Sequence, residues 1–456
     1  NLLGTDAFQE TDVVGISMPI TKWNIQVTKA EHIPAAIAKA FYIAQSGRPG
    51  PVLIDITKDA QFGETDFEYK KCTNIRSYYP RPKLKKAVAL DAAKLINEAK
   101  KPYLLIGQGI MLSNAEKELL EFVEKSGIPV ASTLLGLGAF PQNHSQYVGY
   151  LGMHGDYAPN IKTNECDVLI AIGMRFDDRV TGDVSRYAKQ AKVVHVDIDA
   201  SELNKIIKAD VAVHADAKEA LKFLFELVEQ KQHTAWLQEF KDAKKVEVET
   251  LKASAKELYS EELKMDEVIK MLSEITNGEA IVVTDVGQHQ MMTARYYQYN
   301  KTKSNVTSGG LGTMGFALPA AIGAKFGAPQ KPVVAIIGDG GFQMTLQELG
   351  TILQSEVDIK IIILNNRFLG MVRQWQQLFF EKRYSFTEMI SPDFIALSKS
   401  YSIEAKKLEA RAGLKESLVE MLNYKGAYLL EVMVAKEENV FPMMTTGASV
   451  SEIRLN

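Results

Sequence analysis

Two apolar runs in the last third of the chain end abruptly at polar residues. Residues 333–337 lead into a Gly-Asp-Gly motif centred on Asp339, and residues 359–364 lead into an Asn-Asn pair that ends at Asn366. Apolar runs of this length that stop at polar residues are typical of buried strands. Between them, residues 341–353 predict a single helix with one buried face. Its apolar positions are Leu346, Leu349, Ile352 and Leu353.

The same alternation of helical and strand patterns continues through most of the chain. A helix is predicted at residues 30–46, and strands are predicted at 52–56, 103–106, 129–133, 168–172, 192–197 and 280–285. Strands separated by helices imply crossover connections and parallel sheets. We therefore predict an α/β protein with three doubly wound parallel-sheet domains. The first of them is incomplete, because residues 1–65 hold too little to close such a sheet.

Two polar stretches divide the chain. Residues 70–86 carry two prolines and many charges, which indicates an interdomain linker. Residues 231–260 are rich in Lys and Glu and favour a solvated connecting helix. The predicted organisation is residues 1–69 as part of a first domain, 70–86 as linker, 87–230 as central domain, 231–261 as connecting helix and 262–456 as last domain.

Composition excludes several classes of function. With 46% hydrophobic and 24% charged residues, the 456-residue chain is an ordinary globular protein with a sizeable core. A net charge of −3 argues against nucleic-acid binding, and no apolar run reaches membrane-spanning length. The only two cysteines, Cys72 and Cys166, support neither a disulfide framework nor a zinc site, so we expect a reducing compartment and a cytoplasmic location.

The polar strand ends suggest a metal and a phosphate. The Asp339 carboxylate and the Asn366 amide can share one hard cation through oxygen, and the helix that follows Asp339 would turn its N-terminus towards an anion. A third strand end carries Gln288 and His289, which can donate to phosphate oxygens, although a structural role is the usual one for a single histidine. A Gly-Asp-Gly turn alone is common. Followed by one helix, one strand and Asn-Asn, it has the spacing of the thiamine-diphosphate motif, so the chain resembles a thiamine-diphosphate enzyme here.

Three further motifs each have a purely structural interpretation. Met314 lies among glycines, where it could wedge a cofactor into a strained shape or fill the core. Gly107-Gln108-Gly109 follows a predicted strand but lacks the third glycine of a dinucleotide fingerprint, so a tight turn explains it equally well. Residues 175–179 would ordinarily be interpreted as a charged surface turn.

Taken together, the motifs resemble the large catalytic subunit of acetohydroxyacid synthase, also called acetolactate synthase, over essentially the whole chain. They are GTDAFQE at 4–10, GRPGP at 47–51, LGMHG at 151–155, GMRFDDRVTG at 173–182, VGQHQ at 286–290, GGLGTMG at 309–315 and NNRFLGMVRQWQ at 365–376. The resemblance implies that the three domains bind, in order, the aminopyrimidine ring, FAD and the diphosphate. It also implies a carboligation of pyruvate with pyruvate or 2-ketobutyrate, with loss of CO2, in branched-chain amino-acid biosynthesis.

The same resemblance assigns roles to individual residues. Magnesium would be held by Asp339, Asn366 and the carbonyl of Phe368. Thiamine diphosphate would contact Gly287, Gln288, His289, Gly312, Met314, Gly338 and Gly340. Substrate would meet Met371 and Trp375, with Phe8, Gln9 and Lys58 reaching the site from a partner subunit. FAD, largely structural in this family, would contact Arg48, Gly107, Gly109, Thr133, Leu134, Met153, His154, Gly173, Arg175, Asp177, Arg179 and Asp216.

Some implications extend beyond the residues present. The family's catalytic glutamate lies upstream of the segment that matches residues 4–9, so we expect the complete protein to carry roughly 70 or more further N-terminal residues. Active sites shared between subunits imply at least a homodimer, and a separate regulatory subunit often accompanies the family. Gln108, Arg367 and Phe368 depart from the usual family residues. Alternatives are the FAD-free catabolic acetolactate synthase, pyruvate oxidase or a simple decarboxylase, and a non-catalytic cofactor-binding relative.

Overall fold

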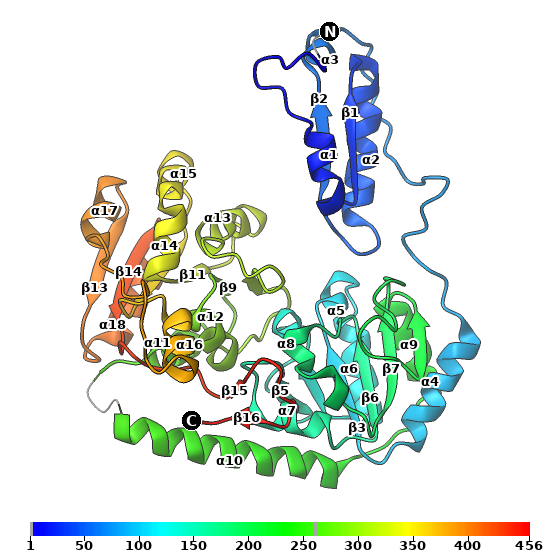
Figure 1. Ribbon diagram of the computed structural model, residues 1–456, viewed down its shortest axis with the longest axis vertical. Coiled ribbons are helices and arrows are strands. Elements are labelled where there is room, and N and C mark those ends of the chain that lie inside the picture. The colour runs from blue at the N-terminus through cyan, green and yellow to red at the C-terminus, as the bar shows by residue number, and fades with distance from the viewer. Residues whose placement is uncertain (1–2, 259–261) are drawn as a thin grey trace.

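The computed structural model describes residues 3–258 and 262–456, and it divides into three bodies of secondary structure (Figure 1). We call them the first unit (residues 3–62), the central unit (86–228) and the C-terminal unit (262–435). Two predicted bounds lie outside the described residues: the start of the first domain, at residues 1–2, and the end of the connecting helix, at residues 259–261. The prediction of an α/β fold built on parallel sheets is confirmed.

The first unit contains one small parallel sheet. Strands β1 (Trp23–Val27) and β2 (Val52–Ile56) pair in parallel, and they are accompanied by helices α1 (Val13–Ser17), α2 (Ile33–Gln45) and α3 (Lys58–Phe62). The helix predicted at 30–46 is a 3-10 turn, Ala30–His32, followed by α2, because Pro34 fits the first turn of a helix. An extended segment of residues 63–85 connects this unit to the rest (Figure 1).

The central unit is built on a six-stranded parallel sheet with the order β5-β4-β3-β6-β7-β8. Its strands are β3 (Pro102–Ile106), β4 (Val130–Ser132), β5 (Tyr147–Tyr150), β6 (Val168–Ile172), β7 (Lys192–Asp197) and β8 (Val211–His214). Its helices are α4 (Lys86–Glu98), α5 (Gly109–Leu112), α6 (Glu116–Ser126), α7 (Tyr157–Thr163), α8 (Asp178–Thr181) and α9 (Ala217–Leu227).

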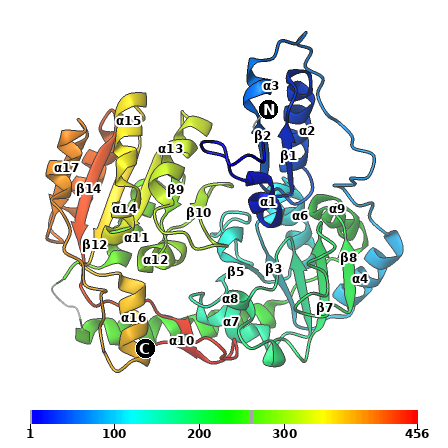
Figure 2. The ribbon, with the colours of Figure 1, turned by 45° about the horizontal axis from the view of Figure 1, so that its top comes forward.

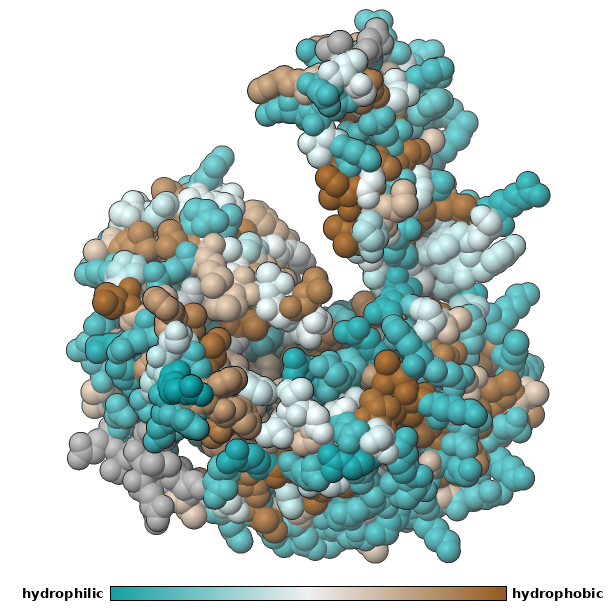
Figure 3. All heavy atoms as spheres, in the orientation of Figure 1, coloured by the Kyte–Doolittle hydropathy of each residue, from teal (hydrophilic) through white to brown (hydrophobic). Residues whose placement is uncertain are grey.

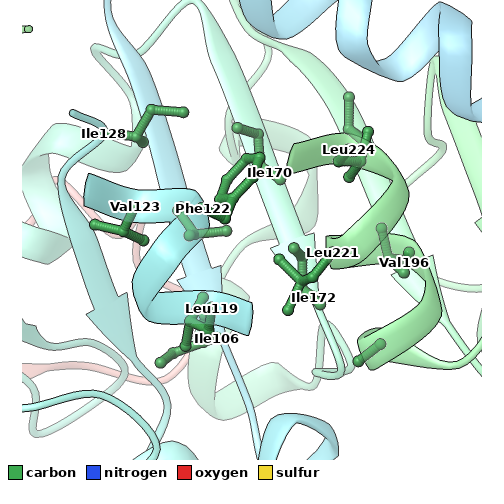
Figure 4. Close-up of a cluster of buried hydrophobic side chains, with 14 of the residues drawn as sticks. Ile106, Leu119, Phe122, Val123, Ile128, Ile170, Ile172, Val196, Leu221 and Leu224 are labelled. Atoms are coloured by element: carbon green, nitrogen blue, oxygen red, sulfur yellow. The ribbon is translucent and has the colours of Figure 1, made fainter. Parts of the chain in front are cut away.

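Alternation along the central strands sends side chains to two separate cores. Ile106, Ile170 and Ile172 meet α6 and α9 on one face, where Phe122 and Leu224 pack (Figure 4). The odd-numbered neighbours on β3 face the other side, which α7 and the long helix α10 (Thr234–Leu258) cover. Both faces are buried, as expected for a parallel sheet between helices.

The C-terminal unit repeats this architecture with the strand order β10-β9-β11-β12-β14-β13. Its strands are β9 (Ile281–Thr284), β10 (Asn305–Thr307), β11 (Val333–Gly338), β12 (Lys360–Asn365), β13 (Glu404–Leu408) and β14 (Tyr428–Met433). Its helices are α11 (Met265–Ile275), α12 (Gln288–Tyr296), α13 (Ala317–Gly327), α14 (Asp339–Thr345), α15 (Leu349–Ser355), α16 (Gly370–Phe379), α17 (Phe394–Ser400) and α18 (Leu414–Asn423). The strands β9, β11 and β12 are neighbours, so their carboxyl ends meet at one edge.

The prediction of one continuous helix over 341–353 is wrong. The segment is divided into α14, a 3-10 turn at Leu346–Glu348, and α15. At the break, Thr345 leaves the helical region with φ −137° and ψ 21°, and its hydroxyl donates to the carbonyl of Gly315 across 2.8 Å. A contact to a distant loop therefore interrupts a helix whose apolar spacing is continuous.

Two segments join the central and C-terminal units. Helix α10 lies along the lower side of both (Figure 1), and a C-terminal strap, residues 436–456, returns to the central unit beside α7 and α8 (Figure 2). The strap contains the antiparallel pair β15 (Met443–Met444) and β16 (Ile453–Arg454). The amide of Met444 donates to the carbonyl of Met153 across 2.7 Å, which fixes the strap to the central unit. No helix in the described part of the chain is long and apolar enough to cross a membrane.

Candidate cofactor-binding site

The carboxyl ends of β9, β11 and β12 enclose a small cavity of about 50 Å³. The structure brings together here ten residues that the sequence singled out. They are Gly287, Gln288, His289, Met314, Gly338, Asp339, Gly340, Asn366, Phe368 and Met371. The predicted convergence of three strand ends is therefore present in the fold.

Asp339 is buried in this cavity, and one of its carboxylate oxygens accepts no hydrogen bond from the described residues. Its Oδ2 accepts from the Ser391 hydroxyl at 3.5 Å, whereas Oδ1 has no hydrogen-bond partner among the described residues. Burial raises the pKa of Asp339 to about 7, because the ionised carboxylate is poorly solvated there. A hard cation bound at Oδ1 would supply the missing partner and favour the ionised form.

Asn366 is held in a fixed orientation beside this carboxylate. Its Nδ2 donates to Oε1 of Gln288 at 3.2 Å, and its Oδ1 accepts from the backbone N–H of Phe368 at 3.2 Å. Gln288 in turn donates from Nε2 to Oε1 of Gln374 at 2.9 Å and to the carbonyl of Glu438 at 2.8 Å. In the described residues, no group of three or more His, Cys, Asp or Glu side chains could hold a metal. A cation here would therefore rely on one carboxylate together with amide and carbonyl oxygens.

Three helices begin at the cavity without a side-chain cap. The N-cap residues of α12, α14 and α16 are Gly287, Gly338 and Leu369, and none makes a side-chain hydrogen bond to the first turn. Free backbone N–H groups and the positive end of the helix dipole favour an anion at such positions. The sequence placed this role on the helix after Asp339. Helix α14 does begin at the cavity, but it has only seven residues, and the longer helices α12 and α16 add two further N-termini.

His289 presents an unused ring nitrogen to the same space. Its Nε2 has no partner among the described residues, and burial lowers the pKa of His289 to about 4. Glycines leave room for the ring, because a Cβ on Gly287 or Gly338 would lie 3.0 Å from it. A neighbouring phosphate would favour the protonated ring and its Nε2–H. The orphaned oxygen, the orphaned nitrogen and the uncapped helices fit a metal-bound diphosphate.

A second cavity of about 1150 Å³ adjoins the first, where the central and C-terminal units meet below the first unit (Figure 3). The two cavities share Val286, Gly287, Met314, Met371 and Val372 in their walls. Every residue that the sequence linked to a flavin lines the large cavity, namely Arg48, Gly107, Gly109, Thr133, Leu134, Met153, His154, Gly173, Arg175, Asp177, Arg179 and Asp216. Gly312 and Trp375 line it as well.

The glycines after β3 and β6 are needed for the fold as well as for the cavity. A Cβ on Gly107 would lie 2.4 Å from the carbonyl oxygen of Gly173, and a Cβ on Gly109 would lie 2.5 Å from the Cα of Gly173. The two loops therefore touch through backbone alone, as a tight-turn interpretation of Gly107-Gln108-Gly109 requires. The exposed side chain of Gln108 lies at the cavity wall without closing it.

Sequence reasoning missed several residues in the large cavity. Asp197 is the last residue of β7 and Glu202 follows that strand; Glu202 pairs with Arg48 of the first unit at 2.6 Å. Burial raises the pKa of Asp197 to about 6. The available signal was an acidic residue at the end of a correctly predicted strand. The other unpredicted wall residues include Leu135, Tyr150, Gln290, Met291, Ser308, Gly309, Gly310, Leu311 and Thr446.

Gln9 and Lys58 are not brought to either cavity within one chain. Both belong to the first unit, where the neighbouring Phe8 is 92% exposed and the ammonium of Lys58 lies 5.8 Å from the ring of Phe62. The first unit contacts the large cavity through residues 47–49 instead.

Comparison with known proteins places this geometry in context. Residues 285–432 match the model of the thiamine pyrophosphate enzyme C-terminal TPP binding domain, and residues 90–224 match the model of the thiamine pyrophosphate enzyme central domain. The chain is 41% identical to an acetolactate synthase large subunit of Buchnera aphidicola, covering 100% of this chain and 81% of that protein. It is 39% identical to the isozyme 3 large subunit of Escherichia coli, covering 100% of this chain and 81% of the relative. It is also 41% identical to the chloroplastic acetolactate synthase 1 of Nicotiana tabacum, with coverages of 99% and 69%.

Proposed function

Because this chain belongs to the acetolactate synthase large subunits, a family of thiamine-diphosphate enzymes, we propose that it joins pyruvate to a second 2-ketoacid with loss of CO2. The second substrate is pyruvate or 2-ketobutyrate, and the product is 2-acetolactate or 2-aceto-2-hydroxybutyrate, for branched-chain amino-acid biosynthesis. The observation that carries the proposal is the convergence of Asp339, Asn366, Gln288 and His289 in one cavity next to a larger one.

Thiamine diphosphate supplies the carbanion chemistry when bound. We assign Asp339, Asn366 and the carbonyl of Phe368 to Mg2+. The first turns of α12 and α16, with Gln288 and His289, would bind the diphosphate. Gly338 and Gly340 leave room at this cavity, since a Cβ on Gly338 would lie 3.0 Å from the ring of His289 and a Cβ on Gly340 would lie 2.5 Å from the side chain of Leu369.

The walls shared by the two cavities are where substrate is proposed to react. Met314 lines both cavities, so it can support the cofactor from the side of the larger one. Met371 lies in both walls and Trp375 one helical turn further along α16 in the large one. These apolar side chains would exclude water and shape the space for the second ketoacid.

FAD is the proposed occupant of the rest of the large cavity. A volume of about 1150 Å³ and glycine-to-glycine loop contacts suit a long, flat ligand. His154 has an Nδ1 without a partner among the described residues, and burial lowers its pKa to about 3, so the ring is neutral. Arg175 and Arg179 line the same cavity and could face phosphates.

Two subunits are proposed to complete each site. Gln9 and Lys58 would approach the cavities of a partner from its first unit, which gives at least a homodimer. The relatives are named large subunits, so a regulatory small subunit is a further proposed partner.

The deciding experiment is a product assay on the full-length protein with pyruvate and 2-ketobutyrate in competition, with Mg2+, thiamine diphosphate and FAD. We expect both acetohydroxyacids, and a flavin spectrum in the purified protein. Full turnover without any bound flavin would favour the FAD-free catabolic enzyme. Acetaldehyde or peroxide as the main product would identify a decarboxylase or oxidase. Cofactor binding without turnover would identify a non-catalytic relative.

A further inference from the structure

A cluster of four charged side chains, of which only Lys244 is substantially exposed, joins the central unit, helix α10 and the C-terminal unit. Asp156 precedes α7, Lys244 and Glu247 lie one turn apart on α10, and Arg295 lies in the last turn of α12. The side chains of Glu247 and Arg295 are 1% and 2% exposed. None of these residues belongs to either cavity wall.

The cluster is internally neutral and closely paired. Arg295 Nη2 lies 2.5 Å from Glu247 Oε1, and Arg295 Nη1 lies 3.4 Å from Asp156 Oδ1. Lys244 Nζ lies 2.9 Å from both of these carboxylate oxygens. Burial alone would raise the pKa of Asp156, but the charges of Lys244 and Arg295 lower it below its ordinary value, so the carboxylate is ionised. Removing one member would leave a buried charge without compensation.

On one side the cluster fixes residues 150–154, a loop in the wall of the large cavity. Glu247 Oε2 accepts from the backbone N–H of Tyr157 at 2.7 Å, and Asp156 Oδ2 accepts from that of Tyr150 at 3.1 Å. Arg295 Nη1 donates to the carbonyl of His154 at 3.4 Å. Residues 150–154, which these bonds hold, form part of the wall of the large cavity.

On the other side the cluster fixes helix α12, which begins in the small cavity. Helix α12 begins with Gln288 and His289 in the small cavity, and Arg295 lies about two turns further along it. Gln290 and Met291 of the same helix line the large cavity. A displacement of α12 is therefore transmitted through Arg295 to residues 150–157, and the reverse holds as well.

We propose that Asp156, Lys244, Glu247 and Arg295 form a positioning cluster that couples the two cofactor cavities, so that a ligand in either one tightens the other. The identity of the two ligands rests on the proposed function. Coupling of this kind is reciprocal: thiamine diphosphate with Mg2+ strengthens FAD binding by the factor by which FAD strengthens thiamine-diphosphate binding. A cluster with a purely structural role would lower stability without changing this factor.

The test is a pair of titrations on full-length, cofactor-free protein. FAD is titrated by its fluorescence with and without thiamine diphosphate and Mg2+, and thiamine diphosphate is titrated with and without FAD. For the wild type we expect a coupling factor of about fivefold or more in both directions. In Glu247→Gln the factor falls to about one, while the affinity for either cofactor alone changes by less than about threefold.

Glu118→Gln is the matched control. Its carboxylate is 10% exposed and pairs with Lys218 and Lys222, but all three lie within the central unit and bridge nothing to α12. This variant keeps the wild-type coupling factor. If Glu247→Gln does not fold, Lys244→Met replaces it, because the Lys244 side chain is 44% exposed and its loss is milder.

Hydrogen exchange gives a second readout that requires only thiamine diphosphate and Mg2+. Adding them slows exchange of the amides at 150–157 in the wild type and not in the Glu247 or Lys244 variant. Equal coupling factors in wild type and variants, or no effect on residues 150–157 in the wild type, would overturn the proposal. If the wild type binds no FAD in the titration without thiamine diphosphate, the FAD assignment is wrong. The hydrogen-exchange experiment then still tests whether the small cavity is coupled to residues 150–157.

Discussion

The side-chain amide of Asn366 donates to Oε1 of Gln288 across 3.2 Å, and this bond joins the end of β12 to the start of α12. Gln288 is held from its other side by Gln374 and by the carbonyl of Glu438. The side-chain oxygen Oδ1 of Asn366 is therefore held in one orientation, and this orientation depends on Gln288 of helix α12.

We predict that Gln288→Ala weakens binding of thiamine diphosphate in the presence of Mg2+ by about 10- to 100-fold. Loss of a residue that orients a metal ligand typically has an effect of this size. Isothermal titration of the full-length protein measures it. Gln298→Ala is the control, because that exposed glutamine lies just beyond the other end of the same helix. An affinity within twofold of wild type in Gln288→Ala would contradict the assigned role.

Trp375 is predicted to set the choice of the second ketoacid. Its ring lies 4.9 Å from that of Phe379, but only Trp375 lines the large cavity. Trp375→Leu should lower the ratio of 2-aceto-2-hydroxybutyrate to 2-acetolactate by about tenfold, since one methylene of substrate is worth about 1–3 kcal/mol in a fitted pocket. Phe379→Leu should leave the ratio unchanged. Equal ratios in both variants would remove Trp375 from the specificity pocket.

If each active site is built from two subunits, a dimer that combines two different inactive variants should regain activity. Lys58→Ala alters the first unit and Asp339→Ala the C-terminal unit, and we expect less than about 1% of wild-type activity from either alone. After the subunits are mixed and re-associated, about half of the dimers are mixed and each holds one intact site, which gives about a quarter of wild-type activity. An inactive mixture would show that Lys58 and Asp339 act within one chain.

Glu438 makes stability depend on pH. Burial, and then the nearby charge of Asp266, raises the pKa of Glu438 to about 7 in the folded protein, against 4.5 for an ordinary glutamate. Between these two values the folded state binds more protons than the unfolded state, so the free energy of unfolding falls as pH rises. The stabilisation is complete below pH 4.5 and is lost above pH 7, and it amounts to at most about 3 kcal/mol.

Glu438→Gln removes this titration. We expect the variant to gain stability relative to wild type between pH 5 and pH 8, measured as the shift of the urea midpoint at each pH. The neighbouring Glu437, half-buried and hydrogen-bonded to the hydroxyl of Tyr384, provides the control variant Glu437→Gln. A difference between Glu438→Gln and wild type that does not change with pH would show that Glu438 titrates normally.

Sequence patterns predicted several strands with the bounds that the structure shows. Residues 52–56, 168–172 and 192–197 are strands with the predicted bounds. The helix over 341–353 was wrong because periodicity cannot anticipate a hydroxyl of Thr345 that bonds a loop thirty residues away. Strand β1 and helix α1 were not predicted at all, since their alternation is weak.

The candidate site divides in the same way. Asp339, Asn366 and His289 follow predicted strands, so parallel topology alone brought them together. Asp197 also ends a predicted strand, but Glu202 meets Arg48 of the first unit, and no local pattern records a contact between units. The part of the site built by one sheet was predictable, and the part built between units was not.

The wall of the large cavity is assembled from segments made at very different times during synthesis. Residues 47–49 emerge early, whereas Thr446 belongs to the strap that fixes the Met153 loop through Met444. A nascent chain on the ribosome therefore lacks part of the wall of the large cavity until translation has passed residue 446. A ligand that needs the complete wall of this cavity can therefore bind only late in the making of the chain.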